Sequence, residues 1–189
     1  SQSFVEEAPR EEVPLRPYVK DVSKYTMMPS SAIGRHVAVE AREDRLAADV
    51  NGFDINREEM RGTETGIICS GVVYQYVREA LPEASVLKLG IVYPLALEKA
   101  RAFAKKVKRL IVVEELEPFI ENQLKAHGIP CEGKSIFSKQ GELSVALIRE
   151  KLLGVKAEER KLDLPVRPPV MCAGCPHRGV FYILGKLKL

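Results

Sequence analysis

Two cysteines near the end of the sequence have the spacing of a metal-binding pair. Cys172 and Cys175 are separated only by Ala-Gly, and a turn this short points both sulfurs the same way. The pair could hold one metal ion or one corner of an iron–sulfur cluster. The spacing also fits a plain tight turn, in which Gly174 and Pro176 shape the backbone. Both interpretations stay open, with Cys172 and Cys175 as candidate metal ligands.

A second set of polar residues follows two apolar strand-like runs. Glu114 and Glu115 end one run, at the edge where parallel sheets bind ligands. Paired carboxylates can transfer protons, but a carboxylate in the first turn of a helix is also favoured by the helix dipole, and we favour this structural role. Ser70 and Gly71 end the other run and could form a phosphate-binding nest, although a lone Ser-Gly is weak evidence. We therefore assign no catalytic residue.

The elements that position these residues alternate between strands and helices. The sequence predicts strands at 66–70, 85–93 and 109–114, a short strand near 131, and helices at 71–81, 97–107, 118–127 and 142–153. This order predicts an α/β fold with a doubly wound, mostly parallel sheet. We expect Ile67, Val86 and Ile111 to lie in adjacent central strands.

The two ends of the chain differ from this regular middle. Residues 1–16 are acidic and lack periodicity, which predicts a loop or disorder. Ser30 or Ser31 could cap a helix to about Val50, and Asn51-Gly52 would end it through a left-handed glycine. A proline-containing linker is expected at 165–169, followed by a helix from 180 whose apolar face should be covered by the sheet domain or by a second copy.

The composition excludes several classes of protein. The 189 residues carry a net charge of +3, with basic and acidic residues interleaved and no basic stripe, so we expect no nucleic-acid partner. The sequence has no apolar stretch long enough to span a membrane and no signal peptide. Four cysteines are too few for a disulfide scaffold, which favours a reducing cytoplasm. Cys69 and Cys131 are predicted to be small buried side chains rather than ligands.

Four segments together resemble a known enzyme family. They are GIICSG (66–71), VLKLGIVYPL (86–95), LIVVEE (110–115) and RPPVMCAGCPHRG (167–179). Their content and order resemble the alpha subunit of the indolepyruvate ferredoxin oxidoreductase family, and the last segment is the most specific. The resemblance implies the tail of a pyrimidine-binding domain and a connector helix at 1–62, and a transketolase C-terminal-like α/β domain at 63–160. It implies a linker and the truncated start of a thiamine diphosphate-binding domain at 161–189.

The resemblance also implies an activity. Enzymes of this family oxidatively decarboxylate indolepyruvate and other aryl 2-oxoacids to acyl-CoA, using thiamine diphosphate, Mg²⁺, 4Fe–4S clusters and ferredoxin. The implied partners are a beta subunit, ferredoxin, coenzyme A and the aryl 2-oxoacid, and a homo-oligomer is possible. His177, at a helix start, could face the cofactor diphosphate or could simply cap the helix.

The family's Mg²⁺-binding motif, its activating glutamate and its ferredoxin-like cysteine runs are absent from this sequence. We therefore expect these 189 residues alone to be inactive and to bind no cofactor. The alternative is a non-catalytic α/β interaction or ligand-binding module, in which the C-x-x-C pair forms a small metal-binding site.

Overall fold

The computed structural model describes residues 9, 11–156, 165 and 170–188. The chain divides into two compact units, Ser1–Ala157 and Glu158–Leu189. Most of the linker predicted at 165–169, and most of residues 1–10, lie outside the described residues. The domain boundaries near residues 62 and 160 remain predictions.

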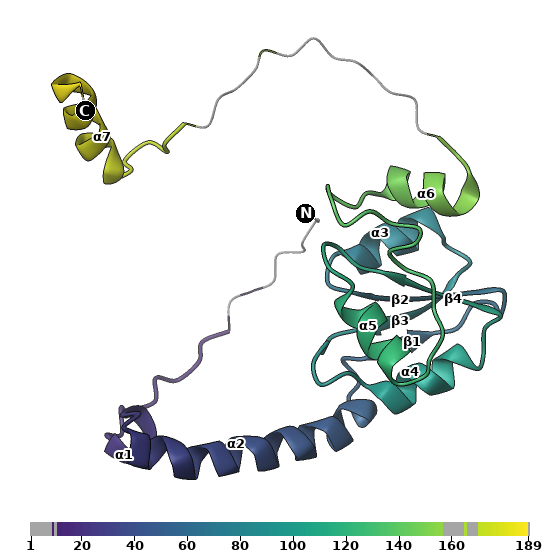
Figure 1. The fold of residues 1–189 in the computed structure, drawn as a ribbon, viewed down its shortest axis with the longest axis horizontal. Coiled ribbons are helices and arrows are strands. Elements are labelled where there is room, and N and C mark those ends of the chain that lie inside the picture. The colour runs from purple at the N-terminus through teal and green to yellow at the C-terminus, as the bar shows by residue number, and fades with distance from the viewer. Residues whose placement is uncertain (1–8, 10, 157–164, 166–169, 189) are drawn as a thin grey trace. The chain divides into compact units, whose positions relative to one another are not determined.

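The described strands belong to one mixed sheet (Figure 1). The strands are β1 (Arg57–Glu59), β2 (Thr65–Ser70), β3 (Ser85–Leu89) and β4 (Arg109–Val113). Their order is β1-β3-β2-β4, with β2 parallel to both β3 and β4 and with β1 antiparallel to β3. Ile67 pairs with both Val86 and Ile111, so the predicted adjacency of these three strands is confirmed.

Helices cover both faces of this sheet (Figure 1). They are α3 (Val73–Ala80), α4 (Leu97–Ala104), α5 (Phe119–Ala126) and α6 (Val145–Leu153). Successive strand residues point to opposite faces. Ile67 therefore packs in the core beneath α3 and α6, whereas Ile68 packs in the core beneath α4 and α5. The predicted doubly wound α/β fold is confirmed.

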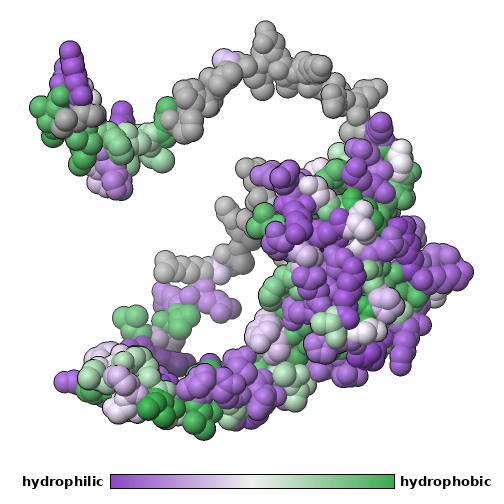
Figure 2. All heavy atoms as spheres, in the orientation of Figure 1, coloured by the Kyte–Doolittle hydropathy of each residue, from purple (hydrophilic) through white to green (hydrophobic). Residues whose placement is uncertain are grey.

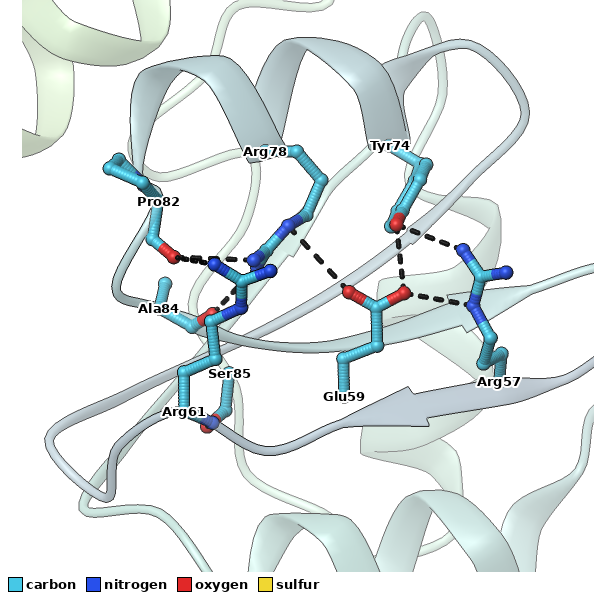
Figure 3. A network of polar contacts seen from close by, with 8 residues as sticks. All are labelled: Arg57, Glu59, Arg61, Tyr74, Arg78, Pro82, Ala84 and Ser85. Atoms are coloured by element: carbon cyan, nitrogen blue, oxygen red, sulfur yellow. Dashed lines mark hydrogen bonds and ion pairs between the residues drawn. The ribbon is translucent and has the colours of Figure 1, made fainter.

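Strand β1 was missed because it has only three residues, all charged. A polar network attaches it to α3 (Figure 3). The Glu59 carboxylate lies 2.8 Å from Arg57 Nε and 3.6 Å from Arg78 Nε, and the Tyr74 hydroxyl donates a hydrogen bond of 2.8 Å to it. Burial raises the pKa of Glu59, but the hydrogen bond from Tyr74 and the two guanidinium groups outweigh it and lower the pKa below its ordinary value. The position of β1 is therefore stabilised by side-chain contacts with α3. Sequence periodicity does not reveal such contacts.

The strand predicted at 85–93 ends earlier than expected, at Leu89. The buried Asn56 side chain explains this end. Its Oδ1 accepts hydrogen bonds from the backbone N–H groups of Gly90 and Ile91, at 2.9 and 3.1 Å, and its Nδ2 donates to the Val50 carbonyl at 3.0 Å. Asn56 thus turns the chain away from the sheet before Pro94 is reached.

The helical connector is present, but its ends differ from the prediction. After the short α1 (Val22–Tyr25), α2 (Pro29–Asp49) begins with Pro29 in its first turn rather than with a serine cap. It continues into a 3-10 turn, η1 (Val50–Gly52), so the predicted left-handed glycine stop is wrong. The Asn51 side chain instead accepts hydrogen bonds from the Glu98 and Lys99 N–H groups at the start of α4. None of the α2 side chains is buried.

The second unit contains the helix α7 (His177–Leu187). Its large apolar side chains are exposed, from 37% at Leu184 to 67% at Tyr182. Figure 2 shows hydrophobic side chains on the surface of this helix and also near α1. That the sheet domain or a second copy covers this apolar face remains a prediction.

Candidate functional site

The predicted ligand pair Cys172 and Cys175 lies in a hydrogen-bonded turn immediately before α7. The Cys175 N–H donates to the Cys172 carbonyl at 3.1 Å, and Gly174 adopts φ +76°, which a residue with a side chain rarely adopts. Cys172 is exposed, Cys175 is half-buried, and both are free thiols. The turn places both cysteines together, as the spacing predicts.

His177 lies in the same site. Its Nδ1 is 3.6 Å from Cys175 Sγ, which is within hydrogen-bonding distance for sulfur. The residue occupies the first position of α7, where backbone N–H groups lack intrahelical partners. The turn and the helix start therefore bring two thiols, one imidazole and unpaired N–H groups together.

The two thiols and the imidazole only partly match the ligands that the implied 4Fe–4S cluster and Mg²⁺ ion require. A 4Fe–4S cluster is held by four cysteines, and Cys172 and Cys175 are two. Within the part of the chain that the structure describes, no three or more His, Cys, Asp or Glu side chains are arranged to hold a metal ion. The described residues therefore do not form a complete cluster site or a complete Mg²⁺ site by themselves. The metal role of Cys172 and Cys175 and the cofactor role of His177 remain predictions.

The carboxyl edge of the sheet contains Glu114, whose role is structural, whereas Glu115 precedes α5 and does not lie in the first turn of a helix as predicted. The Glu114 carboxylate accepts hydrogen bonds from the N–H groups of Ile120 and Glu121, at 2.8 and 3.0 Å. It therefore caps the start of α5, and it is only 7% exposed. A carboxylate with both oxygens engaged in this way is poorly placed to exchange protons with a substrate.

Sequence reasoning missed the neighbouring Glu121, which is 4% exposed. It accepts hydrogen bonds from Lys125 Nζ at 2.5 Å and from the Lys134 N–H at 2.8 Å. Burial raises its pKa, but these hydrogen bonds and the two lysine charges outweigh it and lower the pKa below its ordinary value. A glutamate in the first turn of a helix is usually exposed, so nothing in the sequence indicated this burial.

A hollow of about 290 Å³ lies at this edge, between the ends of β2 and β4. Ser70 and Gly71 line it, and Gly71 adopts φ +57°, as a phosphate-binding turn would require. Glu115 and Glu117 also line it, and their negative charge opposes an anion. The phosphate nest stays an untested prediction that this electrostatic environment disfavours.

A larger cavity of about 510 Å³ lies at the amino ends of β2 and β4. Arg61, Leu81, Arg109 and Leu152 are among its lining residues. Sequence reasoning did not find it, because its walls come from segments far apart in the chain. Arg109 pairs with Glu132 at 2.6 Å and Arg61 donates to the Pro82 carbonyl, so both guanidinium groups already have partners.

The other two thiols differ from those in the turn. Cys69 is fully buried in the core, and burial raises its pKa to about 12. Cys131 is partly buried, and its pKa is raised to about 11, mainly by burial. The predicted burial is therefore confirmed for Cys69 but not for Cys131, and a raised pKa disfavours the reactive thiolate of both.

Comparison with known proteins relates the sequence to one group of enzyme subunits. No protein-family model matches it. The indolepyruvate oxidoreductase subunit IorA of Methanothermobacter thermautotrophicus is 32% identical over 86% of the chain, and that of Thermococcus kodakarensis is 28% identical over 89%. The chain is similar to a segment of these subunits. It spans about 30% of the length of these relatives.

The similarity to IorA extends into both structural units. The match to IorA of Methanothermobacter marburgensis covers 96% of the chain at 28% identity, which leaves about eight of 189 residues unmatched. The second unit, Glu158–Leu189, has more residues than the match leaves out, so the match must extend into it.

A solved structure supports the fold assignment. The 2-oxoglutarate:ferredoxin oxidoreductase of Magnetococcus marinus, solved with 2-oxoglutarate, coenzyme A and succinyl-CoA bound, matches with a TM-score of 0.50 and 17% identity. The match covers 68% of this chain and 24% of that one, and identity this low shows similarity of fold alone. Among the described residues, no helix has the length and apolarity that crossing a membrane requires.

Proposed function

We propose that these 189 residues are a segment of an enzyme that oxidatively decarboxylates indolepyruvate and other aryl 2-oxoacids to acyl-CoA, with ferredoxin as electron acceptor. The observation that carries this proposal is the similarity to IorA over both structural units. The 2-oxoacid:ferredoxin oxidoreductase fold of the sheet unit supports it. In such an enzyme, thiamine diphosphate with Mg²⁺ would supply the chemistry at the 2-oxo carbon, and 4Fe–4S clusters would carry the electrons.

The segment's own residues would have a supporting role in that enzyme. The sheet unit is a rigid α/β body with its hydrophobic core fully formed, so it can serve as one wall of a site completed elsewhere. His177, beside the unpaired N–H groups of α7, would face the cofactor diphosphate. Cys172 and Cys175 would supply two of the thiolates of a cluster, the others coming from outside the segment. The beta subunit and ferredoxin would be the protein partners, in the cytoplasm.

The segment alone is expected to be inactive. Glu114 and Glu121, the buried carboxylates among the described residues, are both bound to backbone N–H groups. Neither is therefore available to activate a cofactor. Two thiols hold a cluster only in part.

The test is an activity assay on the full-length subunit that contains this segment, co-purified with its beta subunit. We expect coenzyme A-dependent reduction of ferredoxin with indolepyruvate, with less activity on pyruvate, and thiamine diphosphate binding detectable by calorimetry. The 189-residue chain, assayed in parallel, should show neither turnover nor cofactor binding. Absence of turnover by the complete complex with all aryl 2-oxoacids would reject the proposed activity.

Residue variants of the complete complex would then test the site. His177→Ala should weaken thiamine diphosphate binding at least about tenfold, because a group near the diphosphate is lost. Arg149→Ala, on the exposed surface of α6, is a control that should leave binding unchanged. If the His177→Ala variant bound the cofactor as tightly as the wild type, His177 would have no role in cofactor binding and would only start the helix.

A further inference from the structure

The turn that carries Cys172 and Cys175 has the geometry that a disulfide bond requires. A four-residue turn closed by a hydrogen bond from its last N–H to its first carbonyl brings its end Cα atoms within about 7 Å. This bond is present, at 3.1 Å between Cys175 N and Cys172 O. Disulfides span Cα separations of about 4.4–6.8 Å, so this turn brings the two cysteines near the separation at which their sulfurs can bond.

Cys172 is the exposed thiol of the four, whereas Cys131 and Cys175 are both partly buried. Cys69 is fully buried in the core. Burial also raises the pKa of Cys131 to about 11, which disfavours its reactive thiolate. An oxidant in solution would therefore meet Cys172 first.

A proton acceptor lies beside the second thiol. His177 Nδ1 is 3.6 Å from Cys175 Sγ, so the imidazole can accept the proton that Cys175 loses when it attacks. The turn thus combines an exposed first thiol, a partly shielded second thiol and a base. This is the arrangement that a dithiol needs to close into a ring after its first reaction.

We propose that Cys172 and Cys175 are a thiol–disulfide exchange site that forms a reversible intramolecular disulfide with low-molecular-weight disulfides such as oxidised glutathione. The Cys172 thiolate attacks one sulfur of glutathione disulfide, forming a mixed disulfide and releasing one glutathione thiolate. Cys175 then gives its proton to His177 and attacks the Cys172 sulfur, and the second glutathione leaves as a thiolate that takes this proton from His177. The protein loses two electrons and two protons, and one glutathione disulfide becomes two glutathione molecules.

The consequence concerns what else the turn can bind. Both sulfurs are used in the disulfide, so the oxidised turn cannot ligate a metal ion or a cluster. Reduction restores both thiols. The site would therefore make ligand binding at the start of α7 dependent on the redox state of the surrounding thiol pool. This inference does not depend on the proposed enzymatic function.

The experiment uses the 189-residue chain, both untreated and after treatment with a chelator, incubated with oxidised glutathione and sampled by acid quenching. We expect intact mass to show the loss of two hydrogens, peptide mapping to show a Cys172–Cys175 bond, and thiol titration to fall from four thiols to two. In Cys172→Ser and in Cys175→Ser the remaining cysteine should carry a lasting glutathione adduct. Cys131→Ser, the matched control, should form the bond as the wild type does.

The role of His177 is tested separately. In His177→Ala, ring closure should be at least about tenfold slower, while the first glutathione adduct forms at the wild-type rate. Closure as fast as in the wild type would remove His177 from the reaction.

Three results would overturn the exchange site itself. One is a wild-type protein that accumulates stable glutathione adducts without closing the ring. Another is a disulfide that joins two molecules, seen as a dimer on non-reducing gels. The third is a protein whose Cys172 and Cys175 react only after chelation has removed stoichiometric metal, which would make the turn a metal site in the isolated chain.

Discussion

The sheet unit and the helices at the two ends of the chain use apolar residues in opposite ways. In the sheet, Ile67, Ile68 and Leu87 are 0% exposed, with helices covering both faces. In α2, Ile33 and Val37 are about 70% exposed, and in α7, Leu187 is 62% exposed. All these helices and strands have apolar residues at regular spacing. Periodicity along the chain thus determines secondary structure, whereas burial needs a second surface, which the helices of the first unit supply for the sheet.

The largest expected effect contrasts one leucine from each region. Leu87→Ala should lower the free energy of unfolding by about 2–5 kcal/mol, because it leaves a cavity in the core between the sheet and α4–α5. Leu187→Ala should change it by less than about 0.5 kcal/mol, because its side chain is mostly exposed in the 189-residue chain. Urea unfolding followed by circular dichroism measures both. A large loss for Leu187→Ala would show that α7 is covered, for example by a second copy, and would break the contrast.

A second contrast concerns polar side chains that end or begin elements. Asn56→Ala should lower the free energy of unfolding by about 2–3 kcal/mol, because it removes a fully buried side chain that accepts hydrogen bonds from the Gly90 and Ile91 N–H groups at the end of β3. Asp21→Ala removes the cap of the exposed α1 and should change global stability by less than about 0.5 kcal/mol. Amide hydrogen exchange at Gly90 and Ile91 should accelerate only in Asn56→Ala. Unchanged exchange there would contradict the role given to Asn56.

The smallest expected effect concerns the dependence of stability on pH. The folded-state pKa of Glu121 lies below its ordinary value, so its ionised form stabilises the fold above the unfolded-state pKa of about 4.3. This contribution is lost as the pH falls from there through the lowered folded-state pKa. Glu121→Gln should therefore cost about 1–2 kcal/mol at neutral pH and progressively less in acid.

Its control is Glu40→Gln in α2, where the carboxylate meets His36 on an exposed helix face. This variant should unfold like the wild type at every pH, because exposed pairs contribute little. Chemical unfolding at a series of pH values measures both. A Glu121→Gln penalty that grew toward acid pH would contradict the assigned direction of the pKa shift.

Much of the fold could be predicted because its strands are locally unambiguous. Ile67-Ile68 and Ile111-Val112 are short apolar runs, and the helices between them have one apolar face each. Strand β1 could not be predicted, because its residues Arg57, Glu58 and Glu59 are all charged. Its backbone pairs with β3, and the side chains of Arg57 and Glu59 contact Tyr74 of α3. The connector's end was also predicted wrongly, because the Asn51 side chain bridges the end of α2 to the start of α4.

The candidate site divides in the same way. The sequence by itself determined that Cys172 and Cys175 lie close together, because both belong to one four-residue turn. It also determined that His177 starts a helix, because a local apolar run follows it. Only the tertiary structure decided that Glu114 caps α5 and that Glu121 is buried and ionised. The physical reason is the distance along the sequence over which the interactions act. Turns and helices form through contacts between residues that are neighbours in the chain. Burial, hydrogen-bond partners and the pKa shifts they cause depend on residues that only folding brings together.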